Sequence, residues 1–242
     1  MIANILLWIL LTLTGATTTV LLAEKYGYEL IIGVFSGLIV TAQVLANKTV
    51  TILEFTVPAG VLVYSTSYLL TDVLAEFHGK EEAKKAVWSG FMASILLVLS
   101  INIAITWPSA AFWKAQEAFV TTLGTTWRIV AASLAAYVVS MNTDVYIFHK
   151  IKEYTGDSKL YLRNMVSTGV AQFIDTVIFI MIAFYGVMPV IPLIIGQYII
   201  KLAIAALDTP YIYLVKWAKK QSWFKSSTLK PDFLNRITGG EA

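Results

Sequence analysis

Seven apolar segments, each long enough to cross a lipid bilayer, dominate this sequence and fix the class of fold. They run over residues 2–23, 30–46, 56–77, 87–106, 128–148, 166–185 and 190–215. Because hydrocarbon offers no hydrogen-bond partner to a peptide group, segments of this kind cross a membrane as helices. A mean hydropathy of +0.72 and a hydrophobic content of 57% exceed those of an ordinary soluble domain. The sequence therefore predicts an all-α, polytopic membrane protein.

The lysines and arginines between these segments predict how the chain is oriented. If all seven segments cross, one side receives Lys25, Lys80, Lys84, Lys85, Lys150, Lys152, Lys159, Arg163 and the six basic residues of 216–242. The opposite side receives only Lys48 and Lys114, with Arg128 at its border. Since basic loops stay in the cytoplasm, we expect a multi-pass protein of the cell membrane with its C-terminus cytoplasmic and its N-terminus outside.

The connection over residues 107–127 differs from the short loops elsewhere. It opens with Trp107-Pro-Ser, a plausible helix start, and places Ala111, Phe112, Ala115, Ala118 and Phe119 at helical spacing opposite Lys114 and Glu117. This pattern predicts a short helix lying at the outer membrane interface, either as an anchor or as a gate over an outer opening.

Charged side chains within or beside the apolar segments give the first indication of function. They are Asp72, Glu76, Arg128, Asp144, Asp175, Lys201 and Asp208. An ionised group at the centre of a membrane costs at least ~2.5–3.5 kcal/mol. Such groups usually line a polar pathway or pocket, so we expect one in this protein.

The carboxylates of the third and fifth segments lie toward the predicted cytoplasmic side. Asp72 and Glu76 are one turn apart on one helical face, which Tyr68 continues outward. Glu76 is also explained by its reaching interfacial water or pairing with Lys80. In the fifth segment, Asp144 lies about one turn from the cytoplasmic end, and Arg128 at the outer border is compatible with a purely interfacial role.

Asp175 and Lys201 lie near the middle of the sixth and seventh segments, so each is the natural partner of the other. Two interpretations remain open: a structural ion pair without a transport role, or the centre of a polar site. Two turns beyond Lys201, Asp208 precedes Pro210, which bends the helix and frees a backbone carbonyl.

Five motifs in order resemble the queuosine precursor transporter family, also called the vitamin-uptake-type family. They are Asn47-Lys48-Thr-Val-Thr with Phe55-Thr-Val-Pro58-Ala-Gly; Tyr68-Leu-Leu-Thr-Asp72-Val-Leu-Ala-Glu76-Phe-His-Gly79; Arg128, Ser133, Tyr137 and Asp144-Val-Tyr-Ile-Phe148; Leu162-Arg163-Asn164 with Gln172 and Asp175-Thr176; and Tyr198, Lys201, Asp208-Thr-Pro210 and Tyr213. The resemblance covers approximately residues 30–215. One departure is Met141, where the family often has a glutamine.

The resemblance implies an importer of 7-deazaguanine bases, such as 7-cyano- or 7-aminomethyl-7-deazaguanine, for tRNA modification. It implies a six-helix core over residues 30–215, with residues 1–29 as an additional N-terminal transmembrane helix and 216–242 as a basic cytoplasmic tail. The family-motif positions that it carries over are Asp72, Ser133, Tyr137, Asp144, Gln172, Asp175, Lys201 and Asp208.

The chemistry of such a base suits these residue types. A carboxylate accepts from its ring N–H and exocyclic amine, Lys201, Gln172 or Arg128 donates to its O6, and aromatic rings stack on its face. The candidate rings are Tyr68, Tyr137, Phe173 and Tyr198. We expect Asp175 and Lys201 in the central pocket and Asp72 and Asp144 toward the cytoplasmic side.

Other classes of function are weighed against this one. The sequence has no phosphate-binding Gly-x-x-x-x-Gly-Lys-Ser/Thr loop, so it hydrolyses no ATP by itself, but it is compatible with a substrate-binding membrane subunit of an ATP-driven vitamin or nucleobase uptake system. The glycine-flanked Asp signature of an intramembrane aspartyl protease is missing, so we expect no enzyme. No cysteine and two histidines predict no cofactor or metal, and nothing in the charge pattern suggests nucleic acid.

Small residues mark one face of the second segment, namely Gly33, Ser36, Gly37 and Thr41. Such a face permits close helix packing in a membrane. Packing within the same chain is the favoured interpretation, and a homodimer is the alternative.

Overall fold

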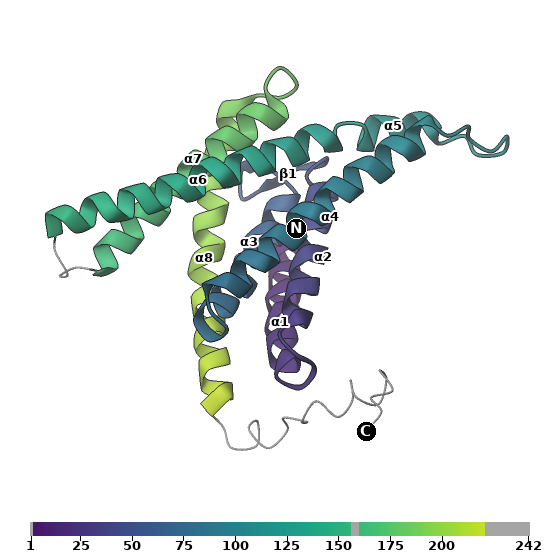
Figure 1. Ribbon diagram of the computed structural model, residues 1–242. Coiled ribbons are helices and arrows are strands. Elements are labelled where there is room, and N and C mark those ends of the chain that lie inside the picture. The colour runs from purple at the N-terminus through teal and green to yellow at the C-terminus, as the bar shows by residue number, and fades with distance from the viewer. Residues whose placement is uncertain (1, 156–159, 221–242) are drawn as a thin grey trace, which may run out of the picture.

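The computed structural model describes residues 2–155 and 160–220, which form eight helices and one β-hairpin (Figure 1). In chain order they are α1 (Ile2–Tyr26), α2 (Glu29–Leu45), β1 (Thr49–Ile52), β2 (Phe55–Pro58), α3 (Gly60–Phe77), α4 (Lys80–Thr106), α5 (Gln116–Leu123), α6 (Thr126–Thr155), α7 (Leu160–Phe184) and α8 (Val190–Lys220).

Each of the seven predicted segments corresponds to one long helix, which confirms the polytopic α-helical class. Five helices (α1, α4, α6, α7 and α8) are long and apolar enough to cross a membrane by length and composition. The apolar helix α2 has 17 residues and α3 has 18, which at 1.5 Å per residue gives lengths of about 26 and 27 Å. Both are close to the thickness of the hydrocarbon core.

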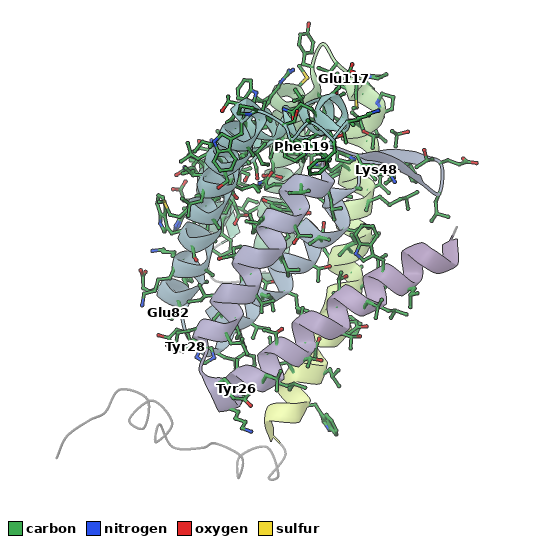
Figure 2. All side chains as sticks on the ribbon, turned by 90° about the vertical axis from the view of Figure 1, so that its right-hand side faces the viewer. Tyr26, Tyr28, Lys48, Glu82, Glu117 and Phe119 are labelled. Atoms are coloured by element: carbon green, nitrogen blue, oxygen red, sulfur yellow. The ribbon has the colours of Figure 1, made fainter. Side chains whose placement is uncertain are left out.

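The helices define two opposite ends of the molecule. In Figure 2, Lys48, Glu117 and Phe119 lie at one end, whereas Tyr26 and Glu82 lie at the other. We call the first the hairpin end, because it carries the turn between β1 and β2 together with α5. We call the second the basic end, because Tyr26 and Glu82 there flank the α1–α2 and α3–α4 connections, beside which Lys25 and Lys80 also lie in the sequence. The orientation of the chain across the membrane stays a prediction.

Side-chain contacts outside the spans join the α1–α2 and α3–α4 connections at the basic end. Tyr28, just before α2, lies near the first turn of α4, and the carboxylate of Glu82 raises the pKa of the Tyr28 phenol above its ordinary value. The Tyr28 ring also packs on His78, with the ring centroids 5.2 Å apart. The two connections at this end are therefore held together by contacts between their side chains.

Residues 49–58 form an antiparallel hairpin, so the expectation that a helix begins at residue 56 was wrong. Thr49 pairs with Pro58 and Ile52 with Phe55, and Leu53 and Glu54 form the turn with φ values of 47° and 72°. Two positive φ angles match the twist of a two-residue hairpin turn. The β-branched residues of both strands favour extended backbone, and α3 begins only at Gly60.

The hairpin lies directly against α8 at Gly196. A Cβ atom at this position would be 2.5 Å from the carbonyl oxygen of Thr56, so only glycine permits the observed approach. Ile52 and Val57 of the hairpin are buried in one apolar cluster with Ile204 of α8. The hairpin thus packs between α3 and α8.

Two further apolar clusters hold the helices together. Leu13 of α1, Phe35 of α2 and Leu70 of α3 belong to a cluster that extends to Val215 of α8. Ile129, Ile180 and Leu193 join α6, α7 and the start of α8 at the hairpin end. Because α1 contributes four buried residues to the first cluster, it is an integral part of the packed bundle.

Helices α6 and α7 form an inclined pair that packs mainly within itself and is tied to its neighbours at the hairpin end (Figure 1). Asn47, just after α2, donates to Thr126 Oγ1 at 3.0 Å and accepts from Thr125 Oγ1 at 2.8 Å. Arg128 donates to the carbonyls of Ile182 at 2.5 Å and Tyr185 at 2.7 Å. A cation at the last carbonyls of α7 also complements its helix dipole.

The connection before α5 corrects a second expectation. Residues 107–115 are not helical, and the helix runs only over Gln116–Leu123. No residue of α5 is buried, and Trp107, Phe112 and Trp113 are exposed. The interfacial position of this helix stays a prediction, but its start at Trp107-Pro-Ser was wrong, because α4 continues to Thr106 and the chain then turns.

The small-residue face of α2 also differs from the favoured interpretation. Gly33, Gly37 and Thr41 are exposed rather than packed within the chain, whereas Ser36 donates to Ser89 of α4 at 2.9 Å. The buried face of α2 is formed instead by larger residues, among them Phe35 and Ile39.

Candidate functional site

Three neighbouring cavities lie among the helices and share lining residues. One has about 420 Å³ of empty space, its open mouth included, and is lined by Ala42, Gln43, Ala46, Pro58, Gly60, Val61, Tyr64, Ser133, Ala136, Asp175, Phe179, Gln197 and Lys201. Because Ala46 and Pro58 lie near the hairpin, we call it the hairpin-side pocket. The other two, of about 1110 and 1290 Å³, share Tyr68, Asp72, Tyr137, Met141 and Asp144. Together we call them the acidic vestibule.

The ion pair predicted between α7 and α8 is present at the boundary between these cavities. Lys201 Nζ lies 2.5 Å from Asp175 Oδ2, and the two residues are only 3% and 6% exposed. Both line the hairpin-side pocket and one cavity of the acidic vestibule. The Lys201 ammonium is also 5.6 Å from the ring centroid of Tyr64, a cation–π distance. The pair therefore forms part of a wall between the two sides.

The acidic vestibule presents an excess of hydrogen-bond acceptors. Asp72 of α3 and Asp144 of α6 line both of its cavities. Within the described ranges, Asp144 Oδ1, Gln172 Oε1 and Ser65 Oγ are buried without a hydrogen-bond partner. Lys80 and Lys84 lie where the vestibule approaches the basic end. Surroundings of this kind favour a ligand that donates hydrogen bonds or carries positive charge.

The structure brings most of the sequence-predicted site residues to these cavities. Those that line at least one cavity are Tyr68, Asp72, Ser133, Tyr137, Asp144, Gln172, Asp175 and Lys201. They come from α3, α6, α7 and α8, as far as 133 positions apart in sequence, and converge because these helices surround one centre. Their roles in binding remain predictions.

Two residues that the sequence suggested lie outside the three cavities, and the side chain of a third is not described. The Tyr198 hydroxyl donates to the Gly169 carbonyl at 3.2 Å and its ring packs on Phe173, with centroids 5.4 Å apart, so it braces α8 against α7 outside the described cavities. Arg128 is occupied at the carbonyls of α7 and lines none of the three cavities, which excludes it as a donor to a ligand there in this arrangement. Asp208 lies on α8, but its side chain is outside the described residues.

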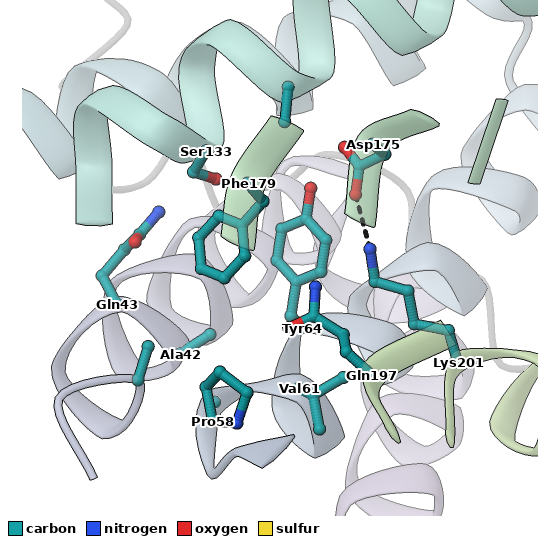
Figure 3. Close-up of a pocket in the computed structure, with 13 residues that line it drawn as sticks. Ala42, Gln43, Pro58, Val61, Tyr64, Ser133, Asp175, Phe179, Gln197 and Lys201 are labelled. Atoms are coloured by element: carbon teal, nitrogen blue, oxygen red, sulfur yellow. Dashed lines mark hydrogen bonds and ion pairs between the residues drawn. The ribbon is translucent and has the colours of Figure 1, made fainter. Parts of the chain in front are cut away.

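Sequence reasoning missed the residues that give the hairpin-side pocket its character. Figure 3 shows Gln43 on the opposite side of this pocket from the ion pair, with the rings of Phe179 and Tyr64 between them. Gln197 lies one turn before Lys201 on α8 and also lines the pocket. The available signal was an amide within an apolar segment, which is costly in hydrocarbon for the same reason as a charge.

Comparison with known proteins gives one family. Residues 58–215 match the family model described as "Putative vitamin uptake transporter". The "Probable queuosine precursor transporter" of Bacillus subtilis (strain 168) is 35% identical over 181 residues, which cover 73% of this chain and 79% of that protein. A protein of the same name from Haemophilus influenzae is 27% identical over 131 residues, 52% of this chain and 51% of that protein. No solved structure matches significantly.

The matched range runs from the end of the hairpin to the last part of α8 and so includes every cavity-lining residue except those of α2 and Ala46. A polytopic helical bundle with polar cavities at its centre is the architecture that a transporter requires. The family model covers more than half of the 242 residues. This chain therefore belongs to the membrane transporter family described as "Putative vitamin uptake transporter".

Proposed function

We propose that this protein imports queuosine precursor bases, 7-cyano- or 7-aminomethyl-7-deazaguanine, across the cell membrane. The names of the two relatives support the substrate class. One observation carries the proposed mechanism: the Asp175–Lys201 pair lines cavities on both of its sides. A carrier needs such a point, because a bound solute must reach either side of a barrier without opening both at once.

The chemistry of the pair suits the pyrimidine edge of a 7-deazaguanine. The Asp175 carboxylate accepts from the ring N1–H and the 2-amino group, and the Lys201 ammonium donates to O6. Each ion then exchanges its partner in the pair for polar groups of the base, so neither charge is left unpaired in the membrane. The neighbouring ring of Tyr64 provides a face on which the flat base stacks.

The two ends of the molecule set the direction of the path. The basic end faces the cytoplasm by the positive-inside rule, so the base enters through the hairpin-side pocket and leaves through the acidic vestibule. Asp72 and Asp144 of the vestibule accept from the donor edge of the departing base. They also favour the cationic aminomethyl group over the neutral nitrile.

Uptake by the purified protein in liposomes tests the function. We expect labelled 7-cyano-7-deazaguanine to enter protein-containing liposomes and not protein-free ones, with unlabelled base competing and unlabelled uracil not competing. Addition of a proton uncoupler under an imposed proton gradient separates proton coupling from facilitated diffusion. Binding without uptake by the protein alone, together with copurification of an ATPase, would instead identify a substrate-binding subunit of an ATP-driven system.

A further inference from the structure

Two glutamine side chains are buried against the hairpin-side pocket without a protein partner. Gln43 of α2 is 4% exposed and Gln197 of α8 is 3% exposed. Neither side-chain amide makes a hydrogen bond to any residue in the described part of the chain, and both line the pocket (Figure 3). Asn47, one turn beyond Gln43, is by contrast fully engaged with Thr125 and Thr126.

The two amides reach the open space of the pocket, since their atoms are not among the fully buried side-chain atoms that lack a partner. Only water or a ligand in the pocket can bond to them, and a polar group left there without such a partner costs about 1–3 kcal/mol. A methionine has nearly the same volume and shape and would avoid this cost. A role of the two amides in binding a polar ligand therefore explains them better than a role in stabilising the fold.

The pocket also defines the shape of that ligand. Ring faces of Tyr64 and Phe179 lie between Gln43 and the ion pair (Figure 3). A primary amide offers an NH2 group as donor and a carbonyl oxygen as acceptor in a single plane. Aromatic faces and in-plane amides together match a flat heteroaromatic base, whose donors and acceptors all lie at its edges.

We propose that Gln43 and Gln197 recognise the edges of the base that the ion pair leaves free, and that Gln43 selects free bases over nucleosides. This inference rests on the proposed function. With the N1–H, 2-amino and O6 groups at Asp175 and Lys201, the opposite edge presents N3 as an acceptor beside N9–H as a donor. Gln43, opposite the ion pair, donates from Nε2 to N3 and accepts from N9–H at Oε1.

Gln197 then serves the remaining edge. It lies one turn from Lys201 on the same helix, beside the O6 side of the bound base. From there its Nε2 donates to O6 or to the nitrogen of a 7-cyano group. A nucleoside carries ribose at N9 and so has no proton for Gln43, and its sugar is directed into the α2 wall of the pocket. The pocket thus rejects nucleosides by both a missing donor and a steric clash.

Binding and stability measured on the same variants test this inference. We expect Gln43→Met and Gln197→Met each to weaken binding of 7-cyano-7-deazaguanine about tenfold or more, as for loss of hydrogen bonds to a buried ligand. Thermal stability without ligand should be unchanged or higher, because an unpaired buried amide is removed. The matched control is Gln116→Met on exposed α5, which should bind as the wild type does.

The N9-methyl derivative of the same base isolates the role of Gln43. The wild type should bind this derivative much more weakly than the free base. In Gln43→Met the difference between the two affinities should be smaller, because the hydrogen bond from N9–H is already lost and only the steric part remains. If the wild type binds the base and both variants bind it equally well, or if the variants lose thermal stability in parallel with binding, the inference is wrong and the proposed function stands. If the wild type binds no 7-deazaguanine, the proposed function fails first.

Discussion

At the residue scale, the Asp175–Lys201 pair combines a structural and a functional interpretation. The pair is almost fully buried, and its two side chains come from different helices. Removal of one partner from a buried pair typically costs about 3–5 kcal/mol, whereas replacement of both is often nearly neutral. The pair also lines a cavity on each of its two sides, and a purely structural ion pair does not need such cavities.

This difference gives a prediction with two variants. Lys201→Met alone should lower the free energy of unfolding by about 3–5 kcal/mol, because Asp175 is left as an uncompensated buried charge. The double variant Asp175→Asn with Lys201→Met should recover most of that stability and still fail to transport the base. Thermal unfolding in detergent and uptake into liposomes are the two measurements. A double variant that is stable and transports normally would show that the pair is structural alone.

The sequence indicated the charged residues that line the cavities more strongly than the neutral ones. Asp72, Asp144, Asp175 and Lys201 stand out because an ionised group in a long apolar segment has few structural explanations. Gln43, Gln197 and Tyr64 give a weaker signal, since a neutral polar side chain costs less than a charge in hydrocarbon. Which neutral side chains face a cavity depends on the rotation of each helix, and this is set by packing between helices.

At the element scale, the seven long helices could be predicted, and the hairpin could not. Apolar length is a strong signal because the membrane excludes other backbone structures. The hairpin of residues 49–58 lies next to an apolar segment, and its turn at Leu53-Glu54 lacks the Asn-Gly or Asp-Gly pattern that marks tight hairpins. Its contact with Gly196, far along the chain, is a tertiary feature without a local sequence signal.

The hairpin makes a second prediction possible. Gly196→Ala would place a methyl group 2.5 Å from the Thr56 carbonyl oxygen, so the hairpin must move away from α8. We expect a loss of about 1–3 kcal/mol in stability, as in other overpacked sites, and a disturbed hairpin-side pocket. Gly37→Ala on α2 is the matched control. A Cβ there meets nothing, and alanine favours the helix by up to about 1 kcal/mol.

Thermal unfolding and binding of the base distinguish the two glycines. Gly196→Ala should unfold at a lower temperature and bind the base more weakly, whereas Gly37→Ala should unfold at the same or a higher temperature and bind normally. Equal behaviour of the two variants would mean that the contact between the hairpin and α8 contributes little.

At the scale of the whole molecule, the two ends are built differently. The hairpin end is held by Asn47 between α2 and α6 and by Arg128 between α6 and α7. The larger cavities lie on the other side of the ion pair and approach the basic end at Lys80 and Lys84. An arrangement with one tied end and a wide vestibule at the other corresponds to one state of an alternating-access carrier.

The sequence has no cysteine, so single cysteines can report which end of the molecule is open. Lys48→Cys and Lys80→Cys mark the hairpin end and the basic end, and a membrane-impermeant thiol reagent should label the first only from outside and the second only from the cytoplasm. Met141→Cys lines both cavities of the vestibule. It should be labelled from the cytoplasmic side and protected by the base. Ala46→Cys lines the hairpin-side pocket and is buried, so it should resist the reagent from either side.

Loosening the hairpin end should then reverse this pattern. Asn47→Ala removes the bonds to Thr125 and Thr126, which frees the start of α6 to separate from α2. In this background we expect Ala46→Cys to become reactive from outside and Met141→Cys to react more slowly from the cytoplasm, because the two openings exclude each other. Faster reaction at both positions would indicate a loosened bundle. Unchanged rates at both would mean that Asn47 does not hold the closed end, and the barrier on that side would have to lie at the hairpin itself.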